Sequence, residues 1–430
     1  MRPDGPIARR SSGPSSGCTG GPADSGRASD PPARPQPTGP HESMPPALRI
    51  VDVINTAASA KEILLDRVCQ FHRPPLIENW IVCSAGDHVD HVRACGLPVA
   101  VIDTPRGLEP AALARATWRL MRVFRKLRPS IVHTHSSVPG AVGRVAARAA
   151  GVPIVVHTVH GFHFHKGTRS ASKVLSCATE RALAALTDML LMQNREDLRA
   201  VRRWRGVRAR LIGNGIDVQR HARRARAHSG AGRVVACIAR FEPVKNHRDL
   251  LRVFARVRAA CPQARLRLIG DGPLRPQCER AAADLGIASA TEFVGYREDV
   301  GALLADVDVA VLLSWKEGIA RGLLEPMAAG IPVVAWRVKG NREVVRSGET
   351  GLLAAPGDVD ATAAHIVRLL EDPALRTRMG AAAAERVRRR FDEAIVVARL
   401  AGVYTSLLRD AGYALPTCWE THDYGAVLQA

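Results

Sequence analysis

Short runs of β-branched and aliphatic residues alternate with longer helical patterns along most of this chain, from Leu48 to residue 391. Strand, helix and strand repeated in this order predict a parallel sheet with helices on both of its faces. In such doubly wound folds, ligands bind at the carboxyl ends of the strands. The loops that follow the apolar runs are therefore the first places to search for chemistry.

The alternation occurs twice. In the first half, the expected strands are Arg49–Ile54, Trp80–Cys83, Val99–Ile102, Ser130–His133, Ile154–Thr158 and Met189–Met192, with helices at 60–71, 110–128, 139–150, 170–186 and 194–203. In the second half, the expected strands are Val234–Ala239, Arg265–Ile269, Thr291–Val294, Val307–Leu313, Pro332–Ala335 and Gly351–Leu353, with helices at 246–260, 273–285, 298–305, 322–329, 359–371 and 373–390.

This pattern predicts two tandem Rossmann-like domains, 46–218 and 219–391, that face a cleft. Residues 218–231 are basic and rich in Ala and Gly, and are expected to be a linker. A last helical pattern over 392–411 is expected to cross back to the first domain, before a tail over 412–430.

Residues 1–45 are rich in Pro, Gly and Ser, so they are expected to be disordered. Met44, just before the first strand, is an alternative start of translation, and the N-terminus lacks the apolar core of a signal peptide. No stretch is apolar for long enough to span a membrane. Nine scattered cysteines without a Cys-x-x-Cys pair fit a reducing cytoplasm.

The chain carries 61 Lys and Arg against 41 Asp and Glu, a net charge of +20. Such an excess indicates a polyanionic partner: nucleic acid, an anionic membrane or a phosphorylated substrate. Codon bias in a GC-rich genome would also raise the Arg content.

A nucleic-acid-binding protein should offer aromatic platforms, but only 4% of the residues are aromatic. An NAD-dependent dehydrogenase should carry Gly-x-Gly-x-x-Gly after a first strand, and neither half does.

The loop after the strand Val234–Ala239 places two cations, Arg240 and Lys245, five residues apart, and then Asn246 as an expected helix N-cap. Two cations beside a helix N-terminus form an anion site that suits a diphosphate. A surface loop with unrelated basic residues is the alternative.

A second unusual segment, 314–330, follows the strand Val307–Leu313. Glu317 falls in its turn, and Glu325 lies eight residues later, in the following helix. Gly318 and Gly322 allow backbone amides to approach a ligand closely. Two ionised carboxylates suit sugar hydroxyls, since they accept strong hydrogen bonds. A capping Glu and a solvated Glu are the alternative.

Together, the two motifs resemble the donor domain of retaining glycosyltransferases of family 4, which have the GT-B architecture. That family shows an Arg and a Lys five residues apart, followed by Glu-x7-Glu. Other segments match the family as well: Asn214-Gly215-Ile216-Asp217, Gly270-Asp271-Gly272-Pro273, Phe293-Val294-Gly295 before Asp299, Gly340-Asn341-Arg342-Glu343, and 348–353. The resemblance covers roughly 46–410, and extends to bacterial enzymes that build surface polysaccharides.

The resemblance implies a role for each matching residue. Arg240 and Lys245 would hold the nucleotide diphosphate, Glu325 the ribose hydroxyls, and Glu317 the donor sugar. Further donor contacts would come from backbone amides and from residues near the base: Gly318, Ile319, Ala320 and Arg321, with Tyr296 and Arg297. No metal and no cofactor is expected, because the two cations would neutralise the leaving group.

The first half holds four histidines in the segment 157–165. No carboxylate or Cys completes a metal-ligand set there, so a metal site is not expected. In the resembling family, a histidine at the end of this strand reaches the donor sugar, and His160 matches it. His133 and His135, on the preceding strand, line the cleft or are packed histidines.

The helix 110–128 combines an apolar stripe with many arginines, and Arg199 to Arg210 form a second basic cluster. Packing on the sheet explains the stripe, whereas the basic face suits anionic lipid head groups. We therefore expect a cytoplasmic, peripheral-membrane enzyme that moves a sugar, with retention, from a UDP-linked or other nucleotide donor to a lipid-linked glycan. The alternatives are a GT-B sugar-nucleotide epimerase and a transferase with a small soluble acceptor.

Overall fold

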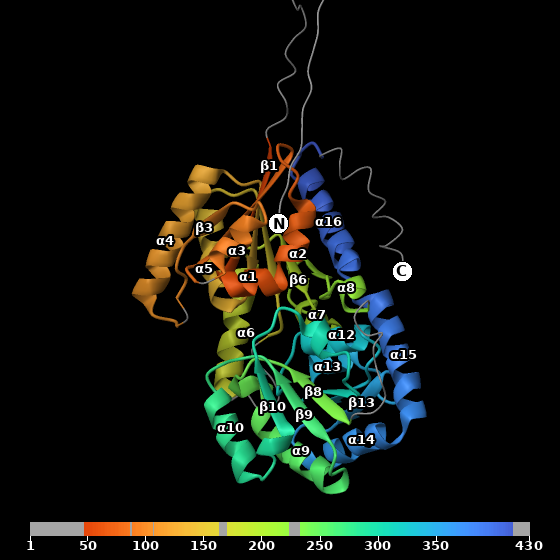
Figure 1. Ribbon diagram of the computed structural model, residues 1–430. Helices are drawn as coiled ribbons and strands as arrows, with labels where there is room; N and C mark the ends of the chain where they lie inside the picture. The colour runs from red at the N-terminus through yellow and green to blue at the C-terminus, as the bar shows by residue number, and fades with distance from the viewer. Residues whose placement is uncertain (1–46, 87, 106, 163–169, 223–232, 416–430) are drawn as a thin grey trace, which may run out of the picture. The chain divides into compact units, whose positions relative to one another are not determined.

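The computed structural model describes residues 47–86, 88–105, 107–162, 170–222 and 233–415. They form two parallel sheets with helices packed on them (Figure 1), which confirms the predicted fold class. The expected tail over 1–45, residues 416–430, and His163 and His165 lie outside the described residues.

The first sheet has seven parallel strands in the order β3-β2-β1-β4-β5-β6-β7. Most of its strand residues are buried, as expected for a parallel sheet covered on both faces. The strands are Leu48–Thr56 (β1), Ile77–Ser84 (β2), Val99–Val101 (β3), Ile131–His135 (β4), Ile154–Val159 (β5), Met189–Met192 (β6) and Ala209–Leu211 (β7).

The helices of the first half are Ala57–Ile63 (α1), Leu65–Phe71 (α2), Val89–Ala94 (α3), Pro110–Leu127 (α4), Ser137–Ala149 (α5), Ser170–Ala184 (α6) and Arg195–Val201 (α7). The single helix predicted over 60–71 was wrong, because the chain divides there into α1 and α2 at Leu64. The sequence did not predict β7 or α3.

The second sheet has six parallel strands in the order β10-β9-β8-β11-β12-β13. They are Val234–Ile238 (β8), Arg265–Ile269 (β9), Thr291–Gly295 (β10), Val309–Leu312 (β11), Val333–Trp336 (β12) and Gly351–Ala354 (β13). A continuous apolar core extends from these strands to the helices around them.

The remaining helices are Val218–Ala222 (α8), Pro243–Lys245 (η2), His247–Ala260 (α9), Arg275–Asp284 (α10), Ala288–Ala290 (η3), Val300–Leu303 (α11), Arg321–Ala328 (α12), Lys339–Val344 (α13), Val359–Glu371 (α14), Pro373–Arg390 (α15) and Glu393–Asp410 (α16). The linker predicted over 218–231 begins with the helix α8, and its residues from 223 on lie outside the described residues.

Each sheet has a point where the strand order reverses: β1 lies beside β4, and β8 lies beside β11. The connections that leave two such strands diverge, so the space at their carboxyl ends stays open for a ligand. In the second sheet, the loops at this point begin at Ala239 and Leu313. They carry Lys245 and Glu317.

The helix α16 packs on the first sheet, although it follows the second one in sequence (Figure 1). Its residues Val396, Leu400 and Leu407 share an apolar cluster with Ile50 of β1 and other residues of the first half. Two polar contacts reinforce this packing: the buried pair Arg67 Nε–Glu393 Oε1 at 2.8 Å, and Tyr404 Oη–His133 Nδ1 at 2.7 Å.

Replacing Leu400 by Ala should destabilise the protein. The side chain is 3% exposed, and a cavity at such a position costs about 2 to 5 kcal/mol of unfolding free energy. Arg409→Ala, at an exposed position of the same helix, should leave the unfolding free energy nearly unchanged. Urea titrations followed by circular dichroism measure both values, and equal stabilities would contradict the packing of α16.

Candidate active site

The two predicted donor loops meet at the switch point of the second sheet. The Trp315 N–H donates to the Val244 carbonyl at 2.9 Å, which ties the loops together through their backbones. Beside this bond, Lys245 Nζ lies 2.6 Å from Glu317 Oε1. The Glu317 side chain is buried and Lys245 is partly exposed. The structure therefore brings together one cation and one carboxylate of the four groups identified in the sequence.

Asn246 is the N-cap residue of α9, as predicted, but its side chain makes no capping hydrogen bond. Its backbone is left-handed (φ 54°), and its side-chain nitrogen donates to Asp249 Oδ2 at 3.0 Å. With its left-handed backbone, Asn246 ends the short helix η2 and lets α9 start in a new direction. This turn places Lys245 beside Glu317.

Glu325 lies on α12, which starts at the end of the Glu317 loop. Its carboxylate is 3.8 Å from Arg321 Nε, one turn earlier. A Cβ at Gly322 would lie 2.2 Å from the Ile238 carbonyl oxygen, so only Gly lets α12 begin against the end of β8. No side chain caps this helix at Ala320, so its first amides keep their affinity for an anion.

Of the other predicted donor residues, Gly318, Ile319 and Ala320 are buried and Arg321 is partly exposed, whereas three lie at the surface. Arg240 is exposed, and its Nε pairs with Glu242 at 3.1 Å. Tyr296 and Arg297 are exposed too, and the Tyr296 ring lies 6.1 Å from the ring of His88, from the first half. Arg240 thus pairs with Glu242, and Glu325 lies beside Arg321.

The first half approaches this site through His160 and Gly161, which follow β5. A Cβ on Gly318 would lie 2.2 Å from the His160 carbonyl oxygen, and one on Gly161 would lie 3.0 Å from the Gly318 Cα. Nearby, Lys339 Nζ pairs with Asp197 Oδ1 at 2.7 Å. The loop that holds Glu317 is thus in direct backbone contact with His160.

The sequence analysis missed Gln193, Asn194, Asp197 and Lys339. Gln193 Nε2 lies 2.9 Å from His160 Nδ1, and Asn194 caps α7 by accepting a hydrogen bond from the Asp197 N–H. The signal was available, because Gln193 and Asn194 directly follow the apolar strand β6. Polar residues at the carboxyl end of a parallel strand belong on a list of site candidates.

His133 and His135 do not line an open surface: both are buried, in a network with Asp52. The three side chains bring ligand-type atoms within 4.8 Å of one another. However, both histidines already use their two ring nitrogens in hydrogen bonds, and Arg67 lines the same small cavity. A cation would have to break these bonds beside a guanidinium, so we assign the cluster to hydrogen bonding.

Burial dominates the electrostatics of these groups. It lowers the pKa values of His133 and His160 well below the usual range, and the neighbouring His135 adds to the effect. Burial also lowers the pKa of Lys316, next to Glu317, to about 8, reinforced by the Lys339 ammonium. A neutral His160 and a readily deprotonated Lys316 therefore flank the pair Lys245–Glu317.

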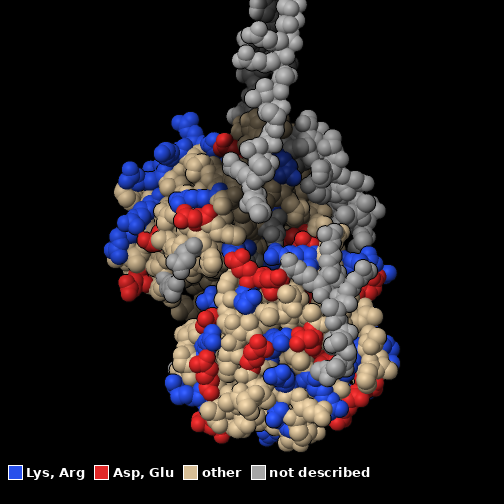
Figure 2. Space-filling view, viewed as in Figure 1, with Lys and Arg blue, Asp and Glu red and all other residues tan. Residues whose placement is uncertain are grey.

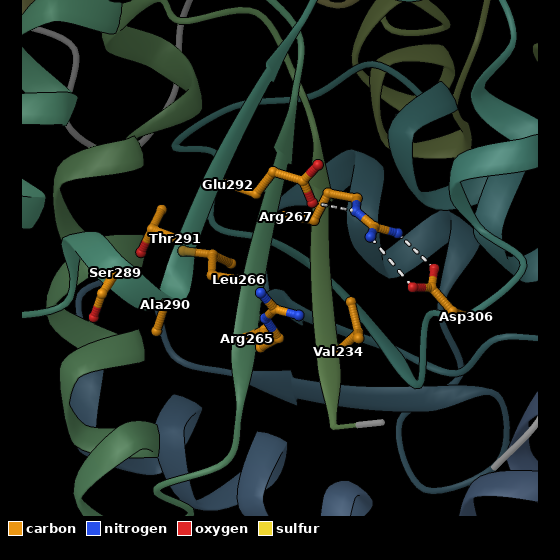
Figure 3. A pocket seen from close by; sticks show the side chains of 9 residues that line it. All are labelled: Val234, Arg265, Leu266, Arg267, Ser289, Ala290, Thr291, Glu292 and Asp306. Atoms are coloured by element: carbon orange, nitrogen blue, oxygen red, sulfur yellow. Dashed lines mark hydrogen bonds and ion pairs between the residues drawn. The ribbon is translucent and has the colours of Figure 1, made fainter. Parts of the chain in front are cut away.

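A hollow of about 440 Å³ lies at the opposite edge of the second sheet (Figure 3). Val234, Arg265 and Thr291, which line it, are the first residues of β8, β9 and β10. Arg267 spans its rim, with pairs to Glu292 and Asp306. Since ligands of doubly wound folds bind at the carboxyl ends, this hollow is not the candidate site.

Two family descriptions match the chain. "Glycosyltransferase Family 4" matches residues 74–220, and "Glycosyl transferases group 1" matches residues 218–386. The two matches are adjacent and extend over both sheets. The motif residues Arg240, Lys245, Glu317 and Glu325 fall within the second.

Curated relatives resemble most of the chain. EpsD of Bacillus subtilis is 31% identical over 306 residues, 67% of this chain and 80% of EpsD. The Escherichia coli UDP-Gal:α-D-GlcNAc-diphosphoundecaprenol α-1,3-galactosyltransferase is 30% identical, over 60% of this chain and 70% of that protein. The N-acetyl-α-D-glucosaminyl L-malate synthase of Bacillus anthracis is 28% identical, over 70% of this chain and 81% of that protein.

Solved structures share the fold. HepE of Anabaena, crystallised with UDP and glucose, superposes with a TM-score of 0.70 at 20% identity, covering 84% of this chain and all of HepE. Sucrose-phosphate synthase of Thermosynechococcus elongatus superposes with a TM-score of 0.71, also at 20% identity and with the same coverage of both chains. Both have the architecture of two parallel sheets described above.

Lys316→Met should raise the melting temperature near pH 7, and its difference from the wild type should shrink as the pH rises. The Lys316 pKa of about 8 in the folded protein lies below its ordinary 10.5, so the folded state disfavours the ammonium below pH 8. Wild-type stability therefore recovers between about pH 8 and 10.5. Melting curves at about pH 7 and 9.5 test this, with exposed Lys126→Met as control. A difference independent of pH would contradict the assignment.

Proposed function

This chain belongs to glycosyltransferase family 4, and from that premise we propose that it transfers a sugar, with retention, from a UDP-sugar to a lipid-linked glycan in surface polysaccharide synthesis. The observation that carries the donor half of this proposal is the Lys245–Glu317 pair at the carboxyl edge of the second sheet. The galactosyltransferase has UDP-Gal in its name, and HepE was crystallised with UDP and glucose, which supports a UDP-sugar as the donor.

In this proposal, Lys245 is the main cation that binds the diphosphate. Lys245 leaves Glu317 for a phosphate oxygen, and exposed Arg240 turns from Glu242 to the same group. The uncapped amides at the start of α12, around Ile319 and Ala320, add dipoles of the same sign. The cations offset the charge that develops on the departing diphosphate, which is the task that a metal ion performs in other transferases.

Carboxylates would then orient the rest of the donor. Glu317, freed from Lys245 and buried, accepts hydrogen bonds from sugar hydroxyls, and Glu325 accepts those of the ribose. His160 approaches the sugar from the first half, while Tyr296 and Arg297 lie toward the base.

The chemical step that we propose takes place on one face of the sugar. The bond from the anomeric carbon to the diphosphate oxygen breaks, and the acceptor oxygen bonds the same carbon from the same side. The departing phosphate oxygen takes the proton of the acceptor hydroxyl, so the configuration is retained. Catalysis then depends on positioning and on the fixed charges around the diphosphate.

The helix α4 favours an acceptor carried in an anionic membrane. Leu120 and Phe124 bury its apolar stripe in the core of the first half, so packing explains the stripe. Its other face exposes a cluster of cations: Arg115, Arg119, Arg122, Arg125 and Lys126. Figure 2 shows Lys and Arg gathered over this helix, at the left of the view. No described helix is both long and apolar enough to cross a bilayer.

A soluble acceptor is the second candidate, because one relative of similar coverage is named an L-malate synthase. This second function uses the same donor as the first and differs from it only in the acceptor. Product analysis with polyprenyl-diphosphate sugars and with small hydroxy acids separates the two functions, and it also detects epimerisation of the donor.

Lys245→Ala should weaken UDP binding about 10- to 100-fold, because it removes a charge-assisted contact with the diphosphate. Sugar transfer should fall below detection while the fold is kept. Glu317→Gln should lose transfer but keep most UDP affinity, since Lys245 remains. Calorimetry with UDP and single-turnover assays provide the measurements, with the exposed Lys126→Ala as control. Near-normal turnover of Lys245→Ala would refute its role.

Replacing Arg115, Arg119 and Arg122 by Gln should weaken binding to phosphatidylglycerol vesicles about 100-fold, since each basic residue contributes about 1 kcal/mol near an anionic surface. The triple change Arg388, Arg389 and Arg390 to Gln removes the same charge from exposed positions of α15, and serves as the matched control. Vesicle sedimentation measures both. Equal loss in the two variants would show that net charge, not α4, governs binding.

A further inference from the structure

Four side chains form a continuous hydrogen-bonded chain across the carboxyl side of the first sheet. His135 Nε2 lies 3.0 Å from Asp52 Oδ1, and His135 Nδ1 lies 3.2 Å from His160 Nε2. His160 Nδ1 lies 2.9 Å from Gln193 Nε2. The residues come from, or directly follow, the neighbouring strands β1, β4, β5 and β6.

The contacts allow one arrangement of protons. Burial raises the pKa of Asp52 to about 6, so above that pH its carboxylate is ionised and can only accept, which puts the proton of His135 on Nε2. In a neutral imidazole, Nδ1 is then an acceptor, and His160 must donate to it from Nε2. His160 Nδ1 is left without a proton and accepts from the Gln193 amide. Burial keeps both histidines neutral, since it lowers the pKa of His135 to about 3 and that of His160 well below its usual range.

The far end of this chain reaches the donor loop. A Cβ on Gly318 would lie 2.2 Å from the His160 carbonyl oxygen and 2.7 Å from Gln193 Oε1. The His160 backbone therefore cannot shift without moving the loop that carries Glu317. The His160 imidazole is held at Nε2 by His135, which is bonded in turn to Asp52, and at Nδ1 by Gln193.

We propose that Asp52 and His135 are positioning residues that hold His160 in its Nε2-protonated tautomer, so that the Nδ1 lone pair accepts a hydrogen bond from a hydroxyl of the bound sugar. Gln193 occupies this lone pair before the substrate arrives. This inference rests on the proposed function, and it adds that the sugar donates to His160 instead of accepting from it.

The test begins with the wild-type protein. Long-range proton–nitrogen correlation spectra of the full chain, labelled with ¹⁵N-histidine, distinguish the two tautomers of a neutral imidazole. His135→Gln and His160→Gln assign the signals. We expect a proton on Nε2 of both residues, and a proton on Nδ1 of His160 would overturn the proposal. This measurement requires neither a substrate nor turnover.

Asp52→Asn should release the tautomer, because an amide can present either its oxygen or its NH₂ group to His135. His160 should then populate both forms, and transfer should slow about 10- to 100-fold with UDP affinity unchanged. Asp308→Asn changes another buried carboxylate, one that accepts from the Val234 N–H in the second half. It should reduce stability without moving the His160 signals.

The outcomes separate the two proposals. A single His160 tautomer and normal turnover in Asp52→Asn would overturn the positioning role. If Asp52→Asn does not fold, the wild-type spectrum still decides which nitrogen carries the proton. If no nucleotide sugar supports transfer although UDP binds and the tautomers are as expected, the proposed acceptor chemistry fails while the hydrogen-bonded chain stands.

Discussion

The reversal of strand order at β8 and β11 is the constraint on which the candidate site depends. The helix α9, which follows β8, packs beside α10 and α14, whereas α12, which follows β11, packs beside α8 and α15. The two connections therefore leave the sheet in different directions, and the backbone bond from Trp315 to Val244 is what holds their first turns together. This bond lies beside the Lys245–Glu317 pair, which joins the same two loops through their side chains.

The sequence was sufficient for the elements whose residues specify them locally. The strands Met189–Met192 and Arg265–Ile269 and the helices 359–371 and 373–390 match the structure to the residue, because turn residues, or Asp N-caps for the two helices, bound each pattern. Several short elements were missed. The strand β7 has three residues and the helix α13 has six, so both depend on neighbours that no local window contains.

Site residues divided in the same way. The meeting of Lys245 and Glu317 could be predicted, since each follows an apolar strand and belongs to a motif that resembles a known family. Asp52 could not be assigned a role, because its partner His135 is 83 residues away. One signal was present: an acidic residue in the middle of the apolar run Leu48–Thr56 is costly to bury without a partner. Such a residue predicts a buried polar contact, but not its identity.

Backbone contact explains why the two halves are coupled so directly at this site. Two backbone segments lie close to Gly318. On one side is the His160 carbonyl, and on the other is Gly340, where an added Cβ would lie 2.5 Å from the Gly318 carbonyl oxygen. Side chains can adjust by changing rotamer, but peptide groups in contact can move only as whole loops. A shift of the Glu317 loop must therefore move the His160 carbonyl, and the hydrogen bonds that link His160 through His135 to Asp52 resist that shift. The proposed donor contacts on one sheet and the histidine on the other are thereby held in a single geometry, which is what the proposed reaction, dependent on positioning, requires.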